Sequence, residues 1–286
     1  YVGLETFVGN VARFDVFGSR LYVRPLAGTE VPVLKNLQVG ATFAMDTDPG
    51  LHTDLHPDLE AVYVYGTDLR QPILSGKAIS LTAFGDVAVL GNQSSVGGMV
   101  GLGGKIAGFL LYGAQIRMLG ENFVPVYFDS TYDLFRYDPD PLVSSKWEIA
   151  TDGTGVNYMP AYTGWLASLG FSLFEDLLVF NASLDGPFRQ TGTGNYLDWP
   201  HLYAELILGK GLVPNLTLEF SYDKRNLAAD QGFFKDLFSF DKSVIQGRVN
   251  YSIGAAVLSL VYDIRWDPMQ NKWVTHSGIE SAIDLF

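Results

Sequence analysis

The chain of 286 residues contains no cysteine and only four histidines. The absence of cysteine excludes a disulfide framework, thiol catalysis and a cysteine-ligated metal site. Basic residues are also scarce: 19 lysines and arginines stand against 31 aspartates and glutamates, a net charge of −12. Because nucleic acids are bound by basic surfaces, we expect no nucleic-acid partner.

Long apolar runs are missing as well. No stretch approaches the roughly 18–20 consecutive apolar residues of a transmembrane helix, which excludes a helical membrane protein. Charged residues make up only 17% of the chain, whereas aromatic residues reach 14%. Aromatic side chains favour pleated surfaces, so this composition favours strands over helices.

Apolar residues recur at every second position along much of the chain. In FLLYGAQIRML at 109–119, one set contains Leu110, Tyr112, Ala114, Ile116 and Met118, and the other includes Gln115 and Arg117. The same period is found at 37–46, 79–89, 165–173, 178–185, 202–208, 216–222, 245–251 and 258–265, and more weakly at 11–26, 59–70, 97–106 and 272–285. A period of two is that of a β-strand. With residues 1–8, the segments predict about 14 strands, or 12 to 16 if some merge or further strands precede them.

The connections alternate in length. Short ones at 107–108, 174–176, 209–215 and 252–255 lie between longer or more polar ones at 46–58, 91–96, 120–161, 186–200, 223–242 and 265–272. Tight turns at one end and long loops at the other describe an up-and-down meander. No repeat or linker divides the chain, so we expect one domain over residues 1–286 with a long loop at 120–161.

Two architectures explain strands with one apolar face: a soluble sandwich, or a membrane barrel whose apolar face meets lipid. The polar positions here are mostly small and neutral with little lysine, unlike a solvated surface. Aromatic residues near the ends of the apolar rows suit the girdles of a membrane barrel: Trp165, Tyr222, Tyr251, Tyr262 and Trp273. The sequence therefore predicts an all-β, transmembrane, up-and-down antiparallel β-barrel, with membrane lipid as a partner.

With these features the chain resembles the outer-membrane β-barrels of diderm bacteria, porin-like channels included, over nearly all of its length. Such barrels commonly end in phenylalanine, as this chain does at Phe286, although Asp284 stands where the family prefers an apolar residue. The aromatic-rich strands and Asp-rich loops also resemble those of spirochaetal outer-membrane proteins. The resemblance implies a location in the bacterial outer membrane. Homo-oligomers or complexes with other envelope proteins remain open as partners.

The polar positions carry charges of both signs. The residues expected to line the lumen are Arg117, Glu205, Glu219, Arg248, Asp263, Arg265, His276 and Glu280, with Asp68, Arg70, Arg20 and Arg24 as further candidates. Such charges either orient polar solutes in a pore or join in ion pairs that satisfy buried polar groups. In loop 120–161, an expected constriction contains Asp129, Asp133, Arg136 and Asp138, but the same loop could instead cap the barrel mouth.

Enzymatic and metal sites are not expected. His276 and Ser277 are adjacent in an expected strand and so point to opposite faces, and no G-x-S-x-G motif occurs. The aspartates of YDPDP at 137–141 and DTDPG at 46–50 do not have EF-hand spacing. No phosphate loop or dinucleotide motif indicates a cofactor. We therefore expect neither catalysis, nor a metal, nor a cofactor.

The function expected from the sequence is passage of small polar solutes through a porin-like channel whose aperture is set by loop 120–161. One alternative is a closed barrel with a structural or adhesive role, or one that belongs to a larger complex. Another is a transporter of hydrophobic ligands that enter through aromatic loops. The connection at 223–242 could contain a short amphipathic helix that plugs the lumen, touches lipid, binds a partner or packs on loop 120–161.

Overall fold

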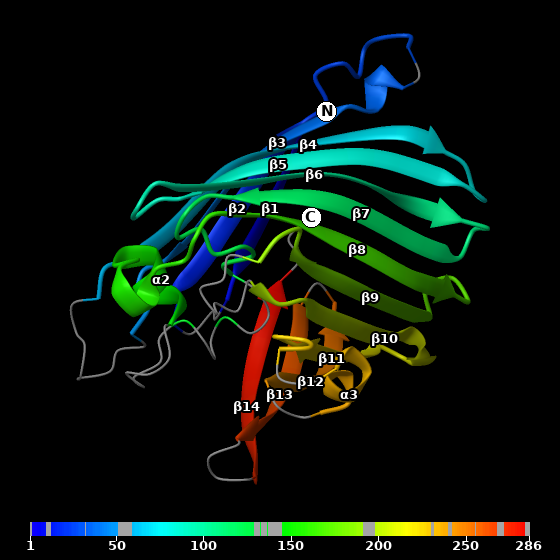
Figure 1. The fold of residues 1–286 in the computed structure, drawn as a ribbon. Coiled ribbons are helices and arrows are strands. Elements are labelled where there is room, and N and C mark those ends of the chain that lie inside the picture. Colours follow the sequence, from blue (N-terminus) through cyan, green and yellow to red (C-terminus); the bar gives the residue numbers. More distant parts are fainter. Residues whose placement is uncertain are drawn as a thin grey trace. The chain divides into compact units, whose positions relative to one another are not determined.

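A computed structural model describes residues 2–9, 13–31, 33–50, 59–128, 132, 136, 145–190, 198–229, 232–239, 242–254, 256–267 and 272–283. These described residues form a single antiparallel sheet of 14 strands, in which the order of the strands is their order in the sequence (Figure 1). The strands are β1 (Val2–Val8), β2 (Val16–Val23), β3 (Gln38–Asp46), β4 (Val62–Ser75), β5 (Ser80–Leu90), β6 (Ser95–Ile106), β7 (Leu110–Leu119), β8 (Tyr162–Leu173), β9 (Leu178–Pro187), β10 (His201–Val213), β11 (Leu216–Lys224), β12 (Ser243–Ile253), β13 (Ala256–Asp267) and β14 (Lys272–Ile283).

The helices whose bounds the described residues define are short. They are the α-helices α2 (Lys146–Thr151) and α3 (Phe233–Leu237) and the single 3-10 turns η1 (Leu34–Asn36) and η2 (Gly155–Asn157). Ser145 begins α2 with a reciprocal capping box, because its side chain accepts from the Glu148 amide while the Glu148 carboxylate accepts from Ser145. None of the helices in the described part of the chain is long and apolar enough to cross a membrane.

The all-β class, the antiparallel up-and-down order and the number of strands expected from the sequence are confirmed, and they are consistent with a barrel. The long connections follow odd-numbered strands, as at 120–161 between β7 and β8. Three connections differ from the expectation. Only residues 268–271 separate the ends of β13 and β14, where a longer or more polar connection at 265–272 was expected. Residues 91–94 are a tight turn, and Ser95 and Val96 already belong to β6. The connection 24–37 between β2 and β3, which includes η1, is longer than the other connections that follow even-numbered strands.

The chain forms two compact units that interleave along the sequence. The first comprises Tyr1–Ile73, Thr82–Gly101 and Ile116–Thr163, and the second comprises Leu74–Leu81, Leu102–Gln115 and Gly164–Phe286. Each unit has its own hydrogen-bonded pairs of strands, and the faces of its strands follow from the pairing register. Whether the units form one folding domain stays a prediction.

In the second unit, the pairing register separates a polar face from an apolar face. A row of directly paired residues crosses six strands on the polar face: Asn181, Glu205, Ser221, Gln246, Asp263 and His276. A row of the opposite parity crosses the same strands on the apolar face: Leu178, Leu208, Leu218, Val249, Leu260 and Ile279. Paired residues lie on one face of a sheet, so the alternation in each strand is matched by its neighbours.

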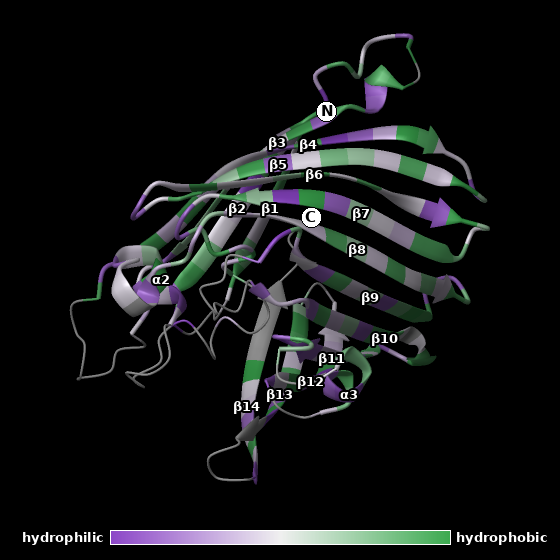
Figure 2. Ribbon diagram, in the orientation of Figure 1, coloured by the Kyte–Doolittle hydropathy of each residue, from purple (hydrophilic) through white to green (hydrophobic). Residues whose placement is uncertain are grey.

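The first unit has the same two faces across β1 to β4. Its apolar face includes rows such as Leu4, Leu21 and Ala41, whereas its polar face includes the row Glu5, Arg20 and Thr42. Figure 2 shows the resulting alternation of hydrophobic and hydrophilic residues along the strands. Each face is therefore predominantly polar or predominantly apolar, and every strand contributes to both.

The apolar faces are exposed. The exposed side chains on strands of both units include Leu4, Phe43, Tyr65, Leu169, Phe220, Leu258, Tyr262 and Ile279. In β7, Ile116 and Met118 are exposed whereas Gln115 and Arg117 are half-buried. A soluble sandwich would bury its apolar face in a shared core, and exposed apolar areas of this extent mark a surface that meets another phase or partner.

Candidate functional site

The polar face of the second unit is a connected set of hydrogen bonds. Glu219 of β11 accepts a hydrogen bond from the Asn250 amide group at 2.6 Å, and Arg248 lies 3.8 Å from its other carboxylate oxygen. Asn250 in turn accepts from the Ser259 hydroxyl at 2.6 Å. On the neighbouring row, the Gln246 amide donates to Asp263 at 2.6 Å. Polar side chains of adjacent strands thus satisfy one another, as buried polar groups require.

The residues expected to line the lumen in this unit lie on that same face. The register aligns Glu205 and Glu219 with the polar rows of β10 and β11, and it pairs Asp263 with His276. Arg265 pairs with Val274 of the same parity and is half-buried. Glu280 pairs with Ser259 through the backbone. These positions therefore share one face of the sheet, and whether that face lines a pore stays a prediction.

In the first unit the central feature of the polar face is Arg20. Its guanidinium donates two hydrogen bonds to Asp68 of β4, at 2.8 and 2.6 Å, and a third to Glu5 of β1 at 3.1 Å. The bond to Asp68 crosses β3 at Gly40, where a Cβ atom would lie 2.3 Å from the Asp68 carboxylate. Glycine at this position therefore allows one arginine to connect strands that are not adjacent.

The other charged positions that were expected to line the lumen in this unit are Arg117, Arg70 and Arg24. Asp86 of β5 interacts electrostatically with both Asp68 and Arg117, so Arg117 belongs to the same group of charges. Arg70 of β4 pairs with Gln38, while Arg24 lies beyond the end of β2 and is exposed. Of the four further candidates from the sequence, Arg20 and Asp68 form an ion pair, Arg70 lies in β4, and Arg24 lies outside the strands.

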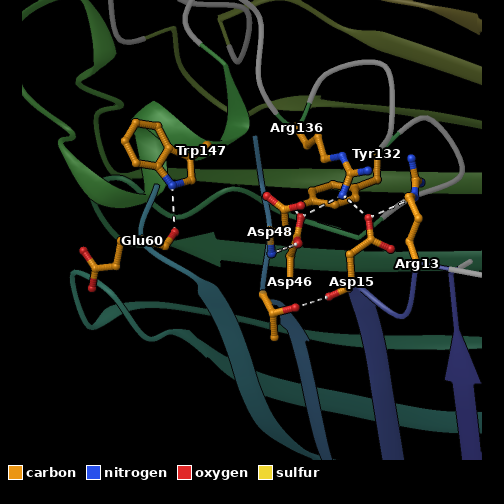
Figure 3. Close-up of polar contacts among 9 residues, drawn as sticks. Arg13, Asp15, Asp46, Asp48, Glu60, Tyr132, Arg136 and Trp147 are labelled. Carbon is orange, nitrogen blue, oxygen red and sulfur yellow. Dashed lines mark hydrogen bonds and ion pairs between the residues drawn. The ribbon is translucent and has the colours of Figure 1, made fainter. Parts of the chain in front are cut away.

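A second polar cluster lies at the ends of β2 and β3 and is centred on Arg136 (Figure 3). The Arg136 side chain is fully buried, and its Nη1 lies 2.9 Å from Asp15 Oδ2 and 3.1 Å from Asp46 Oδ2. Asp46 also accepts a hydrogen bond from the Tyr132 hydroxyl at 2.7 Å. Arg13 approaches Asp15 at 3.3 Å. Because Asp46 belongs to the polar face of β3, this part of segment 120–161 is fixed to that face.

Aromatic rings and a second buried cation complete the Arg136 cluster. The Lys146 ammonium donates to the Tyr127 carbonyl at 2.8 Å and lies 5.7 Å from the centre of the Tyr132 ring. The Tyr127 and Tyr132 rings are themselves in contact, with centroids 5.5 Å apart. Burial raises the pKa of both phenols, so both remain protonated at neutral pH. The Tyr132 hydroxyl is therefore a donor to Asp46 and not an acceptor.

The charge of Asp15 is retained despite its burial. Burial by itself would raise the pKa of Asp15, but the hydrogen bond and charge of Arg136, with a smaller contribution from Arg13, hold that pKa below its usual 3.8. Since the ionised form is the one favoured in the folded protein, the cluster stabilises the fold while Asp15 is charged.

The lowered pKa of Asp15 predicts that the stability of the protein depends on pH in the acid range. When the pKa of a group is lower in the folded than in the unfolded protein, its ionised form stabilises the fold. This stabilisation is complete above the unfolded-state pKa and is lost as pH falls through the folded-state pKa. We expect the stability difference between wild type and Asp15→Asn to be constant from neutral pH down to about 5 and to shrink below pH 4. Urea unfolding across this pH range measures it, and a difference that did not shrink in acid would contradict the assignment.

The constriction expected from the sequence is described only in part. Asp129, Asp133 and Asp138 lie outside the described residues, whereas Arg136 is described and is buried in the cluster with Asp15 and Asp46. Arg136 is therefore an anchor of the segment and not an exposed charge. The sequence could not identify its partners, because they lie 121 and 90 positions away.

The second unit contains another cluster that the sequence analysis missed. His201 begins β10, and its Nδ1 lies 2.8 Å from Asp185 of β9 while its Nε2 lies 3.2 Å from Asp223 of β11. Arg225 approaches the same Asp223 oxygen at 3.4 Å. The alternation of apolar residues predicted a strand over 202–208, and in the structure His201 is the first residue of that strand. Asp185, His201 and Asp223 lie on the same face of three neighbouring strands. This can be recognised only when the pairing register of the strands is known.

Comparisons with known proteins give no family. No protein-family model matches the chain, and no curated protein matches it. Among solved structures, the siderophore receptor PirA from Pseudomonas aeruginosa is similar over 100% of this chain and 52% of the receptor chain, with 11% sequence identity and a TM-score of 0.35. The chain thus spans about half the length of that receptor. A likeness of this size shows nothing about the function of the chain.

Proposed function

We propose that the chain is a β-barrel of the bacterial outer membrane, with its apolar face in contact with lipid and its polar face lining a lumen. The observation that carries this proposal is the exposure of large apolar side chains along one parity of the strands, together with the hydrogen-bonded polar face on the other. In water the apolar face would be unfavourable, whereas in a bilayer it is the face that a barrel presents to lipid.

The proposed activity is passage of small polar solutes through the lumen. The polar face has ion pairs and hydrogen bonds of both signs, such as Arg20 with Asp68 and Arg248 with Glu219. Such a face favours polar, hydrated solutes over apolar ones. The partners that this proposal requires are membrane lipid and the solutes themselves.

Segment 120–161 is proposed to set the aperture. Arg136 fixes the segment to the polar side of β3, which holds part of it against the face that would line the pore. The same observation favours a second candidate, a barrel whose lumen is closed by this segment and whose role is structural or adhesive. Conductance distinguishes the two.

Single-channel conductance of the purified, refolded protein in a planar bilayer tests the proposal. Wild type, Asp129→Ala/Asp133→Ala and a deletion within residues 137–144, which leaves Tyr132 and Arg136 in place, are compared. We expect steps of stable size in wild type that increase on deletion, because an aperture that limits flow becomes wider.

The other outcomes separate the alternatives. A silent wild type that conducts after the deletion would identify a closed barrel. Silence from all three proteins, with their β-structure verified by circular dichroism, would exclude the channel. Arg189→Ala is a control, because Arg189 is exposed beyond β9 and its removal leaves conductance unchanged if the response belongs to segment 120–161.

A further inference from the structure

The connection between β11 and β12 is folded back onto the sheet. The hydroxyl of Tyr222 in β11 donates to the carbonyl of Leu237 in α3 at 3.1 Å. The ammonium of Lys224 donates to the Ser239 hydroxyl at 2.9 Å and lies 3.2 Å from Asp236. The expectation of a short helix in this connection is thus confirmed by α3, and its position is fixed by defined contacts.

These contacts are made from the apolar face of the strands. Tyr222 pairs with Ala204 and Ile245, and Lys224 pairs with Leu202. All are of the parity opposite to the polar row that contains Glu205 and Ser221. The α3 segment is therefore attached at the apolar side of β11, near the end of that strand.

The orientation of α3 follows from its buried and exposed residues. Asp236 is buried and also accepts hydrogen bonds from the Ala228 amide and the Ser239 hydroxyl, so it faces the sheet and the rest of the connection. Phe234 and Phe238, one helical turn apart, have 77% and 79% of their surface exposed. Residues four apart lie on the same side of a helix, so the two rings form one apolar edge directed away from Asp236.

We propose that α3 is an interfacial anchor, whose Phe234 and Phe238 rings insert into the lipid of the leaflet at this end of the barrel. The inference rests on the proposed membrane function, and it names a lipid surface as the binding partner of α3. Continuity with the exposed apolar face carries it, because the helix lies beside strand residues that would themselves meet lipid. Short helices with an aromatic side and a nearby lysine, here the exposed Lys235, are typical of membrane interfaces.

The contacts of α3 argue against a plug in the lumen. A plug would be attached to polar-face residues such as Glu205 or Ser221, whereas the anchoring side chains belong to the opposite face. Lys224 is only 1% exposed and is fixed to Ser239 and Asp236, so it contributes to holding the helix on the apolar side.

The absence of cysteine makes site-directed spin labelling a direct test. Four single-cysteine proteins are labelled in phosphatidylcholine vesicles: Phe234→Cys, Phe238→Cys, Leu260→Cys on the apolar face of β13, and Thr154→Cys in an exposed turn. Collision rates with oxygen, which concentrates in lipid, and with a water-soluble nickel complex are measured. We expect an oxygen-to-nickel ratio at 234 and 238 severalfold above that at 154, and close to that at 260.

Each outcome has a separate meaning. If positions 234 and 238 resemble 154 while 260 lies in lipid, the anchor is wrong and the barrel proposal stands. If position 260 is itself in water, the membrane proposal fails and the anchor fails with it. The labelled phenylalanines are exposed, so their replacement leaves the fold intact, and circular dichroism of each protein verifies this.

Discussion

Arg136→Ala is expected to lower the free energy of unfolding by about 3–5 kcal/mol, because it removes the buried cation that the carboxylates of Asp15 and Asp46 share. Asp15 and Asp46 both lie within hydrogen-bonding distance of the same Arg136 nitrogen, and the arginine is fully buried. Removing one member of such a group costs more than the attraction it provided, since the remaining charges stay out of water. Urea unfolding of the refolded protein measures the loss.

The matched control is Arg189→Ala, which removes an exposed arginine and should change stability by no more than about 0.5 kcal/mol. A rescue variant tests the cause. Arg136→Met combined with Asp15→Asn and Asp46→Asn removes the charges together, so it should recover part of the loss. If the single variant were as stable as wild type, the cluster would not stabilise the fold. If the triple variant were no better than the single one, lost packing would be the cause.

The strands could be predicted from the sequence because apolar and polar residues alternate within each strand according to the two faces of the sheet. In β8, Ala167, Leu169 and Phe171 alternate with Ser168 and Gly170, and the register of β9 repeats that alternation on the same faces. A period of two requires only neighbouring residues, so it survives without knowledge of the partner strand. The same reasoning gave the set of polar-face positions that contains Glu205, Glu219 and Asp263.

The clusters could not be predicted because they depend on which strand ends meet. Arg136 was expected to act with the aspartates next to it in the sequence, but its described carboxylate partners are Asp15 and Asp46. His201 gains its two carboxylates only when β9 and β11 pair on either side of β10. Long-range ion pairs leave no periodic signal, and several acidic residues are always available as candidates.

The helix in 223–242 illustrates an intermediate case. Its apolar residues predicted a short amphipathic helix, but its direction required the contacts of Tyr222 and Lys224. A register slip of one residue in β11 would move those side chains to the polar face and turn the same helix toward the lumen. Whether α3 is an anchor or a plug therefore depends on which face of β11 carries Tyr222 and Lys224.

The other large loss of stability is expected for Leu169→Arg, a substitution on the apolar face of β8. Leu169 lies in the middle of β8, is 58% exposed and belongs to the apolar face. An arginine facing lipid near the bilayer midplane costs about 2–4 kcal/mol of barrel stability. On a soluble protein the same exposed position would change stability by only about 0.5 kcal/mol.

The matched control is the neighbouring Ser168→Arg, which places the same charge on the polar face. Urea unfolding in phosphatidylcholine vesicles should show a large loss for Leu169→Arg and a small one for Ser168→Arg, since only the first arginine must be held in hydrocarbon. Equal small effects would mean that the apolar face meets water or a protein partner. Equal large effects would place both faces of β8 out of water, which excludes an aqueous lumen at that level. The pair of variants thus tests, in one strand, which of its two faces meets lipid.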